Sequence, residues 1–395
     1  MMNEITVAGA GTGSPMHLTP EVKKAIEEAE IIVANKRFFN LILDNKKFIE
    51  LKNFHDTFEK IQNLSGKILI LVSGDVGLYS LLPLLKKKFD NIKVLAGISS
   101  LQILCALTCE SWNDAKILSG HGRDLRAGKF LNIVERNKKT ILFCDKKISP
   151  QWVCEKLKDF SGIEVFIGSN LGNDNEIFLT GRPKDFMEKK FPELSIILIK
   201  NHEVYIPVKN HLRDKDFLRE KNIVMTNESV RAVIFSRLEL SENSLLWDIG
   251  AGSGSVSISA AYENISMEVQ AIEKNSDAVN LISRNAAKFH LHNIKIHEGT
   301  ASEVIKFLPM PTHIFIGGSG GELIKIFDFI KKLKSPVRVV LACVTLETFH
   351  DAYEIMSKLK NFEAVQISAA SSQPLNENLT LMKANNPVMI LSAEI

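Results

Sequence analysis

The stretch LLWDIGAGSGS, residues 245–255, decides the fold of the C-terminal half of this chain. It passes from an apolar strand through Asp248 to three glycines, Gly250, Gly252 and Gly254, and then directly into a helix pattern. Glycines there let the backbone approach a ligand closely, and the helix offers unpaired N–H groups. A pyrophosphate-binding GxGxxG loop would need a sixth-position glycine, where this chain has serine. The loop therefore favours a cofactor without a diphosphate.

Strands and helices alternate strictly on the C-terminal side of this loop. Such alternation requires crossover connections and predicts an α/β fold with a doubly wound, Rossmann-like parallel sheet. A helix over 227–237 precedes the loop. Beyond it we expect strands at 267–275, 294–299, 312–321, 338–344, 363–368 and 387–393, and helices at 277–290, 301–308, 322–333 and 347–360.

Two further strand ends carry polar residues that suit the same cofactor. Glu273 ends the second strand of this half, 25 positions beyond Asp248. A carboxylate at that place can accept both ribose hydroxyls of a nucleoside. EGTA, residues 298–301, follows the third strand. Because open α/β sheets bind ligands at the carboxyl ends of their strands, these three loops are expected to converge.

The N-terminal half carries a nearly identical hexapeptide, GAGTGS, at 9–14. It also follows a strand, but Pro15 interrupts it and the next helix begins only at Pro20, with Thr19 as its N-cap. No acidic residue ends the following strand, EIIVAN. The two loops therefore predict different scaffolds rather than an internal duplication.

Three more glycine turns follow strands in this half: LVSGDVGLYS (71–80), AGISSLQ (96–102) and LSGHGRD (118–124). We expect helices over 77–89, over 98–109 with a serine cap, and around 151–160. The pattern predicts an α/β unit in two lobes over residues 1–205. A charged linker at 206–214 then leads to a second domain at 215–395.

Composition excludes several classes of protein. Hydrophobic residues at 45% and charged residues at 24% are ordinary globular values. A net charge of +3 is small for 395 residues and does not suit a dedicated nucleic-acid binder. The five cysteines form no CxxC pair, and we expect most to be buried in a reducing compartment. With no signal-peptide pattern and no apolar run near 18 residues, the sequence predicts a soluble cytoplasmic protein.

The C-terminal half resembles the class I S-adenosylmethionine (SAM)-dependent methyltransferases. VMTNESVRA (224–232), WDIGAGSG (247–254) and FIGGSGGEL (315–323) look more narrowly like the precorrin-6B C15-methyltransferase (decarboxylating) family. That family often has aspartate where this chain has Thr300, whose hydroxyl still offers an oxygen to the adenine. The resemblance implies SAM contacts from Thr226, Asp248, Gly250, Ala251, Gly252, Ser253, Gly254, Glu273, Thr300 and Ala301.

The N-terminal half resembles the tetrapyrrole methylase superfamily, and its glycine turns look like the precorrin-6Y C5-methyltransferase branch. Val76 and Ala96 stand where the superfamily commonly has proline, so we expect altered stiffness rather than altered chemistry. A second SAM site follows from this resemblance. It implies cofactor contacts from Gly9, Gly11, Gly13, Gly74, Asp75, Ser99 and Ser100.

Together the halves resemble the fused bifunctional precorrin-6Y C5,15-methyltransferases (decarboxylating) of cobalamin synthesis. The resemblance implies two C-methylations of a reduced tetrapyrrole and loss of CO2 from an acetate side chain, with no resident metal and with homo-oligomers. Substrate carboxylates make Arg231, His121 and Arg123 candidate clamps, although Arg231 equally suits a structural ion pair and His121 a hydrogen-bonding loop histidine.

Two rival functions remain open at this point. The C-terminal domain can be read as an RNA methyltransferase, because class I domains accept many substrates. One half can instead be a non-catalytic tetrapyrrole-binding module. The sequence leaves open whether the substrate carries cobalt and in which order the methyl groups are added.

Overall fold

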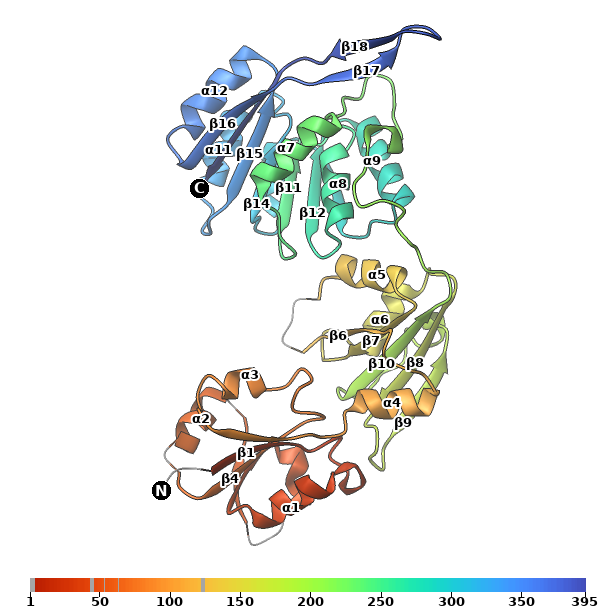
Figure 1. Ribbon diagram of the computed structural model, residues 1–395, viewed down its shortest axis with the longest axis vertical. Helices are drawn as coiled ribbons and strands as arrows, with labels where there is room; N and C mark the ends of the chain where they lie inside the picture. Colours follow the sequence, from red (N-terminus) through yellow and green to blue (C-terminus); the bar gives the residue numbers. More distant parts are fainter. Residues whose placement is uncertain (1–3, 43–45, 53, 63, 122–124) are drawn as a thin grey trace. The chain divides into compact units, whose positions relative to one another are not determined.

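The computed structural model describes residues 4–42, 46–52, 54–62, 64–121 and 125–395. Two compact units divide these residues. The first unit comprises residues 1–125 and 137–204, and the second comprises residues 126–136 and 205–395. Figure 1 colours both along the chain.

The first unit begins with a parallel sheet of five strands in the order β3-β2-β4-β1-β5. Because β4, β1 and β5 are neighbours, the loops that leave their carboxyl ends must meet. Its strands are β1 (Glu4–Gly9), β2 (Ile31–Ala34), β3 (Lys47–Glu50), β4 (Lys67–Val72) and β5 (Ile92–Leu95). Its helices are the 3-10 turns η1 (Pro15–His17) and η2 (Lys36–Leu41) and the α-helices α1 (Pro20–Glu28), α2 (Phe54–Gln62) and α3 (Leu82–Leu85).

Helices cover both faces of this sheet, because alternate strand residues point to opposite sides. Ala8 packs in one cluster with Val22 and Ile26 of α1. Its neighbour Val7 packs in another with Phe58 of α2 and Leu85 of α3. The strands therefore read as near-continuous apolar runs, as parallel strands buried on both faces do.

The first unit contains a second sheet, in the order β6-β7-β10-β8-β9. Only the β6–β7 pair is parallel, and the other three pairs are antiparallel. The two sheets agree with the predicted two lobes. Its elements are α4 (Ser100–Thr108), β6 (Lys116–Ser119), β7 (Lys139–Phe143), α6 (Pro150–Leu157), β8 (Ile163–Ser169), β9 (Ile177–Gly181), η3 (Pro183–Asp185) and β10 (Ser195–Asn201).

The second unit is built on seven strands in the order β13-β12-β11-β14-β15-β19-β16. The chain runs outward from β11 in one direction to β13 and then returns to β14 on the other side, so the carboxyl end of β11 is the topological switch point. Its strands are β11 (Leu245–Ile249), β12 (Glu268–Glu273), β13 (Ile294–Glu298), β14 (His313–Ile316), β15 (Arg338–Cys343), β16 (Lys360–Ile367) and β19 (Val388–Glu394). Its helices are α7 (Glu228–Leu238), α8 (Ser255–Glu263), α9 (Ser276–Lys288), α10 (Ala301–Val304), α11 (Leu323–Ile330) and α12 (Leu346–Met356), with the 3-10 turns η4 (Asp214–Asp216) and η5 (Ile305–Phe307).

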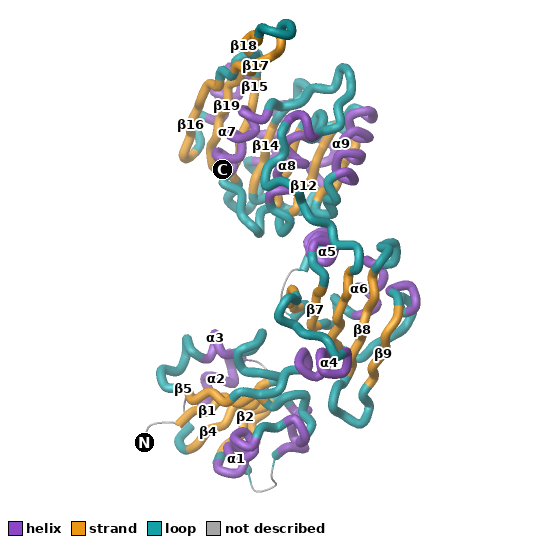
Figure 2. The backbone as a smooth tube through the Cα atoms, turned by 45° about the vertical axis from the view of Figure 1, so that its right-hand side comes forward, coloured by secondary structure: helices purple, strands orange, loops and turns teal. Residues whose placement is uncertain are grey.

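Three features differ from the expected elements. Strand β19 pairs antiparallel with β15 and β16, so this sheet is not wholly parallel. A hairpin of β17 (Ala370–Pro374) and β18 (Thr380–Ala384), which was not expected, projects beyond the sheet (Figures 1 and 2). The helix expected over 77–89 is only α3, because Tyr79 has a positive φ of 50° and Pro83 lies in the first turn of the helix.

Helix α5 (Ala127–Arg136) packs in the second unit although its neighbours along the chain belong to the first. Asn132 donates to the Ile265 carbonyl at 3.3 Å and accepts from the His292 N–H at 3.0 Å. The Glu135 carboxylate contacts His290 Nδ1 at 2.8 Å and His292 Nε2 at 2.9 Å. The sequence pattern did not indicate this helix.

The remaining sequence expectations concern cysteines, metals and membranes. Four of the five cysteines are buried, and Cys109 is exposed. Within the described ranges, no three His, Cys, Asp or Glu side chains group as metal ligands would. A search of the same residues finds no helix with the length and apolar character needed to span a membrane.

Candidate functional site

The glycine loop of the second unit leaves β11 at the switch point. Gly250, Gly252 and Gly254 have φ of 71°, 56° and 75°, a region that side chains other than glycine rarely adopt. A Cβ on Gly250 would lie 2.3 Å from the Gly318 carbonyl oxygen, and one on Gly254 would lie 2.8 Å from Ile282. The predicted glycines are therefore required both by conformation and by space.

Asp248 lies beneath this loop and is fully buried. Its Oδ2 accepts hydrogen bonds from the N–H and the hydroxyl of Ser257. Its Oδ1 has no partner, and neither does the buried hydroxyl of Ser253 in the loop itself. Buried polar atoms without partners are uncommon in proteins. These two suit a ligand with polar groups, such as the cationic amino group of a bound amino-acid moiety.

Burial raises the pKa of Asp248 to about 6; the Ser257 hydrogen bonds oppose this rise and the charge of Glu273 adds to it. An acid whose pKa is raised on folding stabilises the fold fully below its ordinary pKa of about 3.9, and that contribution is lost as the pH rises through about 6. We expect the Asp248→Asn variant not to lose folding stability in this way, because asparagine does not ionise. Relative to wild type, its stability should improve by about 2.5 kcal/mol between pH 4 and pH 7.5.

Calorimetric melting of both proteins across this pH range measures the difference. A gap in melting temperature between Asp248→Asn and wild type that widens with pH supports the buried acid. A gap that stays constant contradicts the raised pKa.

Glu273 connects two of the predicted loops at the end of β12. Its Oε2 accepts from the Gly252 N–H at 2.8 Å, and its Oε1 accepts from the Asn275 N–H at 2.9 Å. Each carboxylate oxygen has a further lone pair, so both can still accept from ribose hydroxyls. The structure therefore brings Glu273 directly against the glycine loop.

The third strand end supplies Thr300 and Ala301, at the start of α10. Gly299 precedes them with a φ of 148°. The Thr300 hydroxyl donates to Glu303 Oε2 at 2.8 Å, which leaves its oxygen able to accept a hydrogen bond. Ala301 is buried and provides apolar surface.

Arg231 of α7 lies in an internal network and is 2% exposed. Its guanidinium donates to Asp214 Oδ1 and to the Thr226 carbonyl, both at 2.6 Å, and to the Leu212 carbonyl at 3.0 Å. The sequence left two roles open for Arg231, a substrate clamp and a structural ion pair. These contacts are those of a structural ion pair. A clamp role would require Arg231 to give up those contacts.

Residues 224–226 lie across the glycine loop. The Ser253 N–H donates to the Val224 carbonyl at 3.1 Å, and the Ser255 hydroxyl donates to the Thr226 carbonyl at 3.4 Å. Because Arg231 holds the same Thr226 carbonyl, it positions this segment. The predicted residue Thr226 is thus next to the cofactor loop.

A cavity of about 670 Å³ opens at the carboxyl ends of β14 and β15. Thr226, Phe315, Cys343 and the whole GGSGG turn at 317–321 contribute to its wall. Among the described residues that line it, none is charged. Gly320 and Gly321 have φ of 58° and 85°, so both adopt the left-handed conformation that favours glycine.

The glycine turns of the first unit are in backbone contact with one another. Gly11 and Gly74 exchange hydrogen bonds, with N···O distances of 3.3 and 2.7 Å. A Cβ on Gly9 would lie 2.4 Å from the Gly74 oxygen and 2.6 Å from Gly97 Cα. Gly97, which the sequence analysis did not single out, thus completes this contact among the ends of β1, β4 and β5.

Asp75 and Ser99 hold these turns in shape. The Asp75 carboxylate accepts from the Gly77 N–H at 2.7 Å and from the Gly97 N–H at 3.1 Å. Ser99 is the N-cap of α4, in a capping box with Gln102 that agrees with the predicted serine cap. Cofactor contact by either residue stays a prediction.

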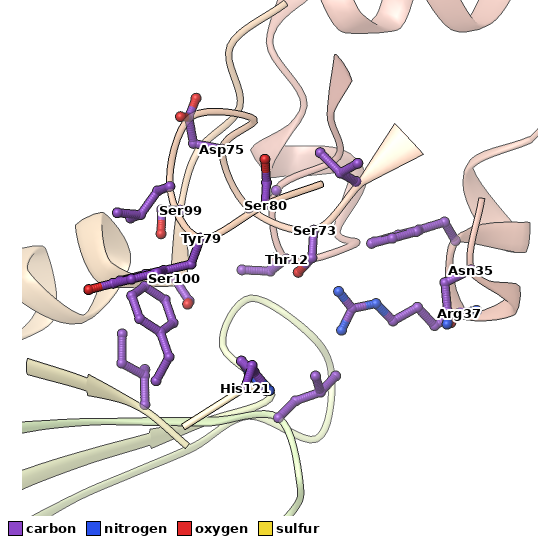
Figure 3. A pocket seen from close by; sticks show the side chains of 18 of the residues that line it. Thr12, Asn35, Arg37, Ser73, Asp75, Tyr79, Ser80, Ser99, Ser100 and His121 are labelled. Carbon is purple, nitrogen blue, oxygen red and sulfur yellow. Dashed lines mark hydrogen bonds between the residues drawn. The ribbon is translucent and has the colours of Figure 1, made fainter. Parts of the chain in front are cut away.

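A cavity of about 900 Å³ lies among these turns and the second sheet of the unit. Figure 3 shows several of its side chains, with Thr12 and Ser73 near the centre, Ser99 and Ser100 on one side, and His121 below. Among the predicted cofactor and clamp residues, Gly11, Gly74, Asp75, Ser99, Ser100 and His121 line it.

Two predicted residues of this half are placed elsewhere, and a third is not described. Gly9 and Gly13 are not in the described cavity lining. Gly13 faces the ring of Phe38, which a Cβ would meet at 3.3 Å. Arg123 lies outside the described residues.

Comparisons with known proteins support the division into two parts. A family described as "Precorrin methyltransferase domain" matches residues 217–394, and "Tetrapyrrole (Corrin/Porphyrin) Methylases" matches residues 4–186. The cobalt-precorrin-6B C(15)-methyltransferase (decarboxylating) of Salmonella typhimurium is 37% identical over 186 residues, 46% of this chain and 95% of the relative.

Another relative extends over both halves. The precorrin-6Y C(5,15)-methyltransferase [decarboxylating] of a Sinorhizobium species is 27% identical over 354 residues, 87% of this chain and 85% of the relative. A solved structure of precorrin-6Y C5,15-methyltransferase from Geobacter metallireducens is 35% identical, with a TM-score of 0.43, and covers 46% of this chain and 95% of that one. Through its C-terminal half, which follows a tetrapyrrole methylase domain, the chain belongs to the family of cobalt-precorrin-6B C(15)-methyltransferases (decarboxylating).

Proposed function

We propose that the protein is a bifunctional SAM-dependent methyltransferase of corrin ring synthesis. It methylates a precorrin or cobalt-precorrin at C5 in the first unit and at C15 in the second, where an acetate side chain also loses CO2. The observation that carries this proposal is that each unit has its own cavity, of about 900 and 670 Å³, at the carboxyl ends of its own strands. The full-length resemblance to a relative named for both positions supports it.

The residues of the second unit fit a SAM molecule. The glycine loop allows close approach of the ligand, the unpartnered Asp248 Oδ1 suits its amino group, and Glu273 suits its ribose. When bound, SAM supplies an electrophilic methyl group. The protein contributes mainly position, because aligning two reactants can remove about 7–11 kcal/mol of a barrier.

Decarboxylation needs little more from the protein. The C–C bond to the carboxylate breaks, CO2 leaves, and the electron pair passes into the conjugated ring before a proton is taken up. The cavity that would receive this part of the substrate has no charged lining residue within the described part of the unit. A carboxylate that loses its water in such a site is destabilised, which favours its conversion to neutral CO2.

The rival assignments receive less support. An RNA substrate would call for lysine and arginine along its path, and the described lining of the second cavity contains neither. A purely binding role for one half would leave its glycine geometry without a function. A cytoplasmic location and homo-oligomers stay predictions from the sequence.

The direct test incubates the purified full chain with SAM and either precorrin-6Y or its cobalt form, followed by mass spectrometry. We expect a product with two added methyl groups and one CO2 lost. Comparison of the two substrates separates the cobalt-dependent from the cobalt-independent route. A product with a single added methyl group would mean that only one unit is active and would contradict the bifunctional proposal.

A further inference from the structure

The turn after β2 carries an arginine, Arg37, beside the cavity of the first unit. Asn35 is the N-cap of η2, and its Oδ1 accepts from the Arg37 N–H at 3.1 Å. The next residue, Phe38, is 1% exposed and so anchors the turn. The Arg37 guanidinium lies over the Phe38 ring, 4.5 Å from its centroid, in a cation–π contact.

Gly13 takes part in this arrangement. It has a φ of 96° and leaves room for the Phe38 ring, which a Cβ would meet at 3.3 Å. The third glycine of the GAGTGS loop therefore supports the residue on which Arg37 rests. The strand order explains why Phe38 lies near Gly13: β2 lies beside β4, and only β4 separates it from β1.

Arg37 lines the cavity of the first unit without an anionic partner. Across the described residues, no carboxylate lies within ion-pair distance of its guanidinium, and burial lowers the pKa of that group. Arginines that lose solvent are usually paired with an anion. An arginine that is half-buried beside an open cavity is therefore suited to an anionic ligand.

Three other charged side chains that line this cavity, those of Lys52, Asp75 and Glu193, already have partners. Lys52 pairs with Glu50 at 3.0 Å, and Glu193 pairs with Lys146 at 3.5 Å. The Asp75 carboxylate is held by backbone N–H groups. Arg37 is thus the arginine in the described lining that is available to bind substrate.

Both SAM and the tetrapyrrole carry carboxylates that suit the Arg37 guanidinium. Figure 3 shows Arg37 and Asn35 on one side of the cavity, and Ser99, Ser100 and Tyr79 on the other. Asp75, Ser99 and Ser100, three of the predicted cofactor residues, lie on that other side, whereas Gly13, against Phe38, does not line the cavity. The position of Arg37 away from these three residues favours the substrate.

We propose that Arg37 binds a carboxylate of the tetrapyrrole and so orients the ring for C5 methylation in the first unit. This inference rests on the proposed function. The planar guanidinium suits a carboxylate because two parallel N–H···O bonds fix direction as well as distance. The stacked Phe38 ring and the capped turn hold the guanidinium in place before the substrate arrives.

The test compares Arg37→Met and Arg37→Lys with Lys52→Met, a matched loss of a paired cation on the same cavity. C5 and C15 methylation are assayed on one full-length protein, and S-adenosylhomocysteine (SAH) affinity is measured by calorimetry. For Arg37→Met we expect kcat/KM for C5 methylation to fall by about 10- to 100-fold, mainly through KM. Arg37→Lys should recover part of this loss, while Lys52→Met should stay near wild type.

C15 methylation and SAH affinity should not change in any of the three variants. Unchanged C5 kinetics in Arg37→Met, or an equal loss in Lys52→Met, would overturn the inference. A loss of SAH affinity in Arg37→Met would overturn it as well, because Arg37 would then bind the cofactor. If wild type shows no C5 methylation at all, the proposed function fails before the role of Arg37 is reached.

Discussion

Replacing Gly250 with alanine should lower C15 methylation and SAM binding by the second unit about 100-fold, while C5 methylation continues. The new Cβ would lie 2.3 Å from the Gly318 carbonyl oxygen, and the residue would have to keep a φ of 71°. Overpacking against backbone and left-handed strain together cost about 3 kcal/mol, or a loss of about 100-fold. Kinetic assay of both methylations in the same protein measures the effect.

Gly318→Ala is the matched control for this substitution. It changes the residue that Gly250 touches, but its own Cβ would have no atom within 4 Å and its φ is not left-handed. We expect it to retain SAH binding by the second unit within a few-fold of wild type. Equal losses of SAH binding in the two variants, or an active Gly250→Ala protein, would show that close packing of the glycine loop is not required.

Gly9→Ala should have the complementary effect and impair C5 methylation only. Its Cβ would fall 2.4 Å from the Gly74 oxygen and 2.6 Å from Gly97 Cα, backbone atoms of two other strand-end turns. Since no flexible side chain can move aside, at least one of these turns must shift, at a cost of about 3 kcal/mol. We expect about a 100-fold loss of C5 activity in kinetic assays.

Gly74→Ala tests the origin of that loss. Its Cβ would meet Ser99 only at ordinary contact distances of 3.6 Å and beyond, so left-handed strain from a φ of 64° is its main cost. That strain is about 1–2 kcal/mol, which predicts a smaller loss than in Gly9→Ala. A change of C15 methylation in either variant, in protein that resists limited proteolysis as wild type does, would contradict independent sites.

Residues at the strand ends of the second unit could be predicted from the sequence, because local spacing defines them. An apolar run followed by Asp248 and alternate glycines requires a strand, a tight turn and a helix in that order. Glu273 ends the next strand for the same reason, and the structure places it against Gly252. The helix caps Thr19 and Ser99 were likewise predictable from a few neighbouring residues.

Contacts between distant loops of the first unit could not be predicted, because they depend on strand order. Nothing local to Gly97 indicates that it touches Gly9, which follows from the order β4-β1-β5. Arg37 left a weak signal, a Lys-Arg pair directly after the strand EIIVAN. The position of Arg37 at the cavity can be recognised only once β2 is known to lie beside β4.

The internal role of Arg231 shows a different limit of the sequence. An arginine on the opening helix of a methyltransferase domain can face the substrate or the protein interior, and the helical spacing allows both. Its partner Asp214 lies 17 residues earlier, in the segment expected to be a linker. The direction of strand β19 could not be predicted either, because an apolar run does not indicate whether a strand is parallel or antiparallel to its neighbours.

The proposed function requires one chain to hold two cofactor sites on unrelated scaffolds. Calorimetric titration of the wild-type full chain with SAH counts these sites without needing the tetrapyrrole. We expect two SAH molecules to bind per chain. One SAH per chain would contradict the proposed function, since one of the two glycine loops would then be only structural and a single methylation would remain.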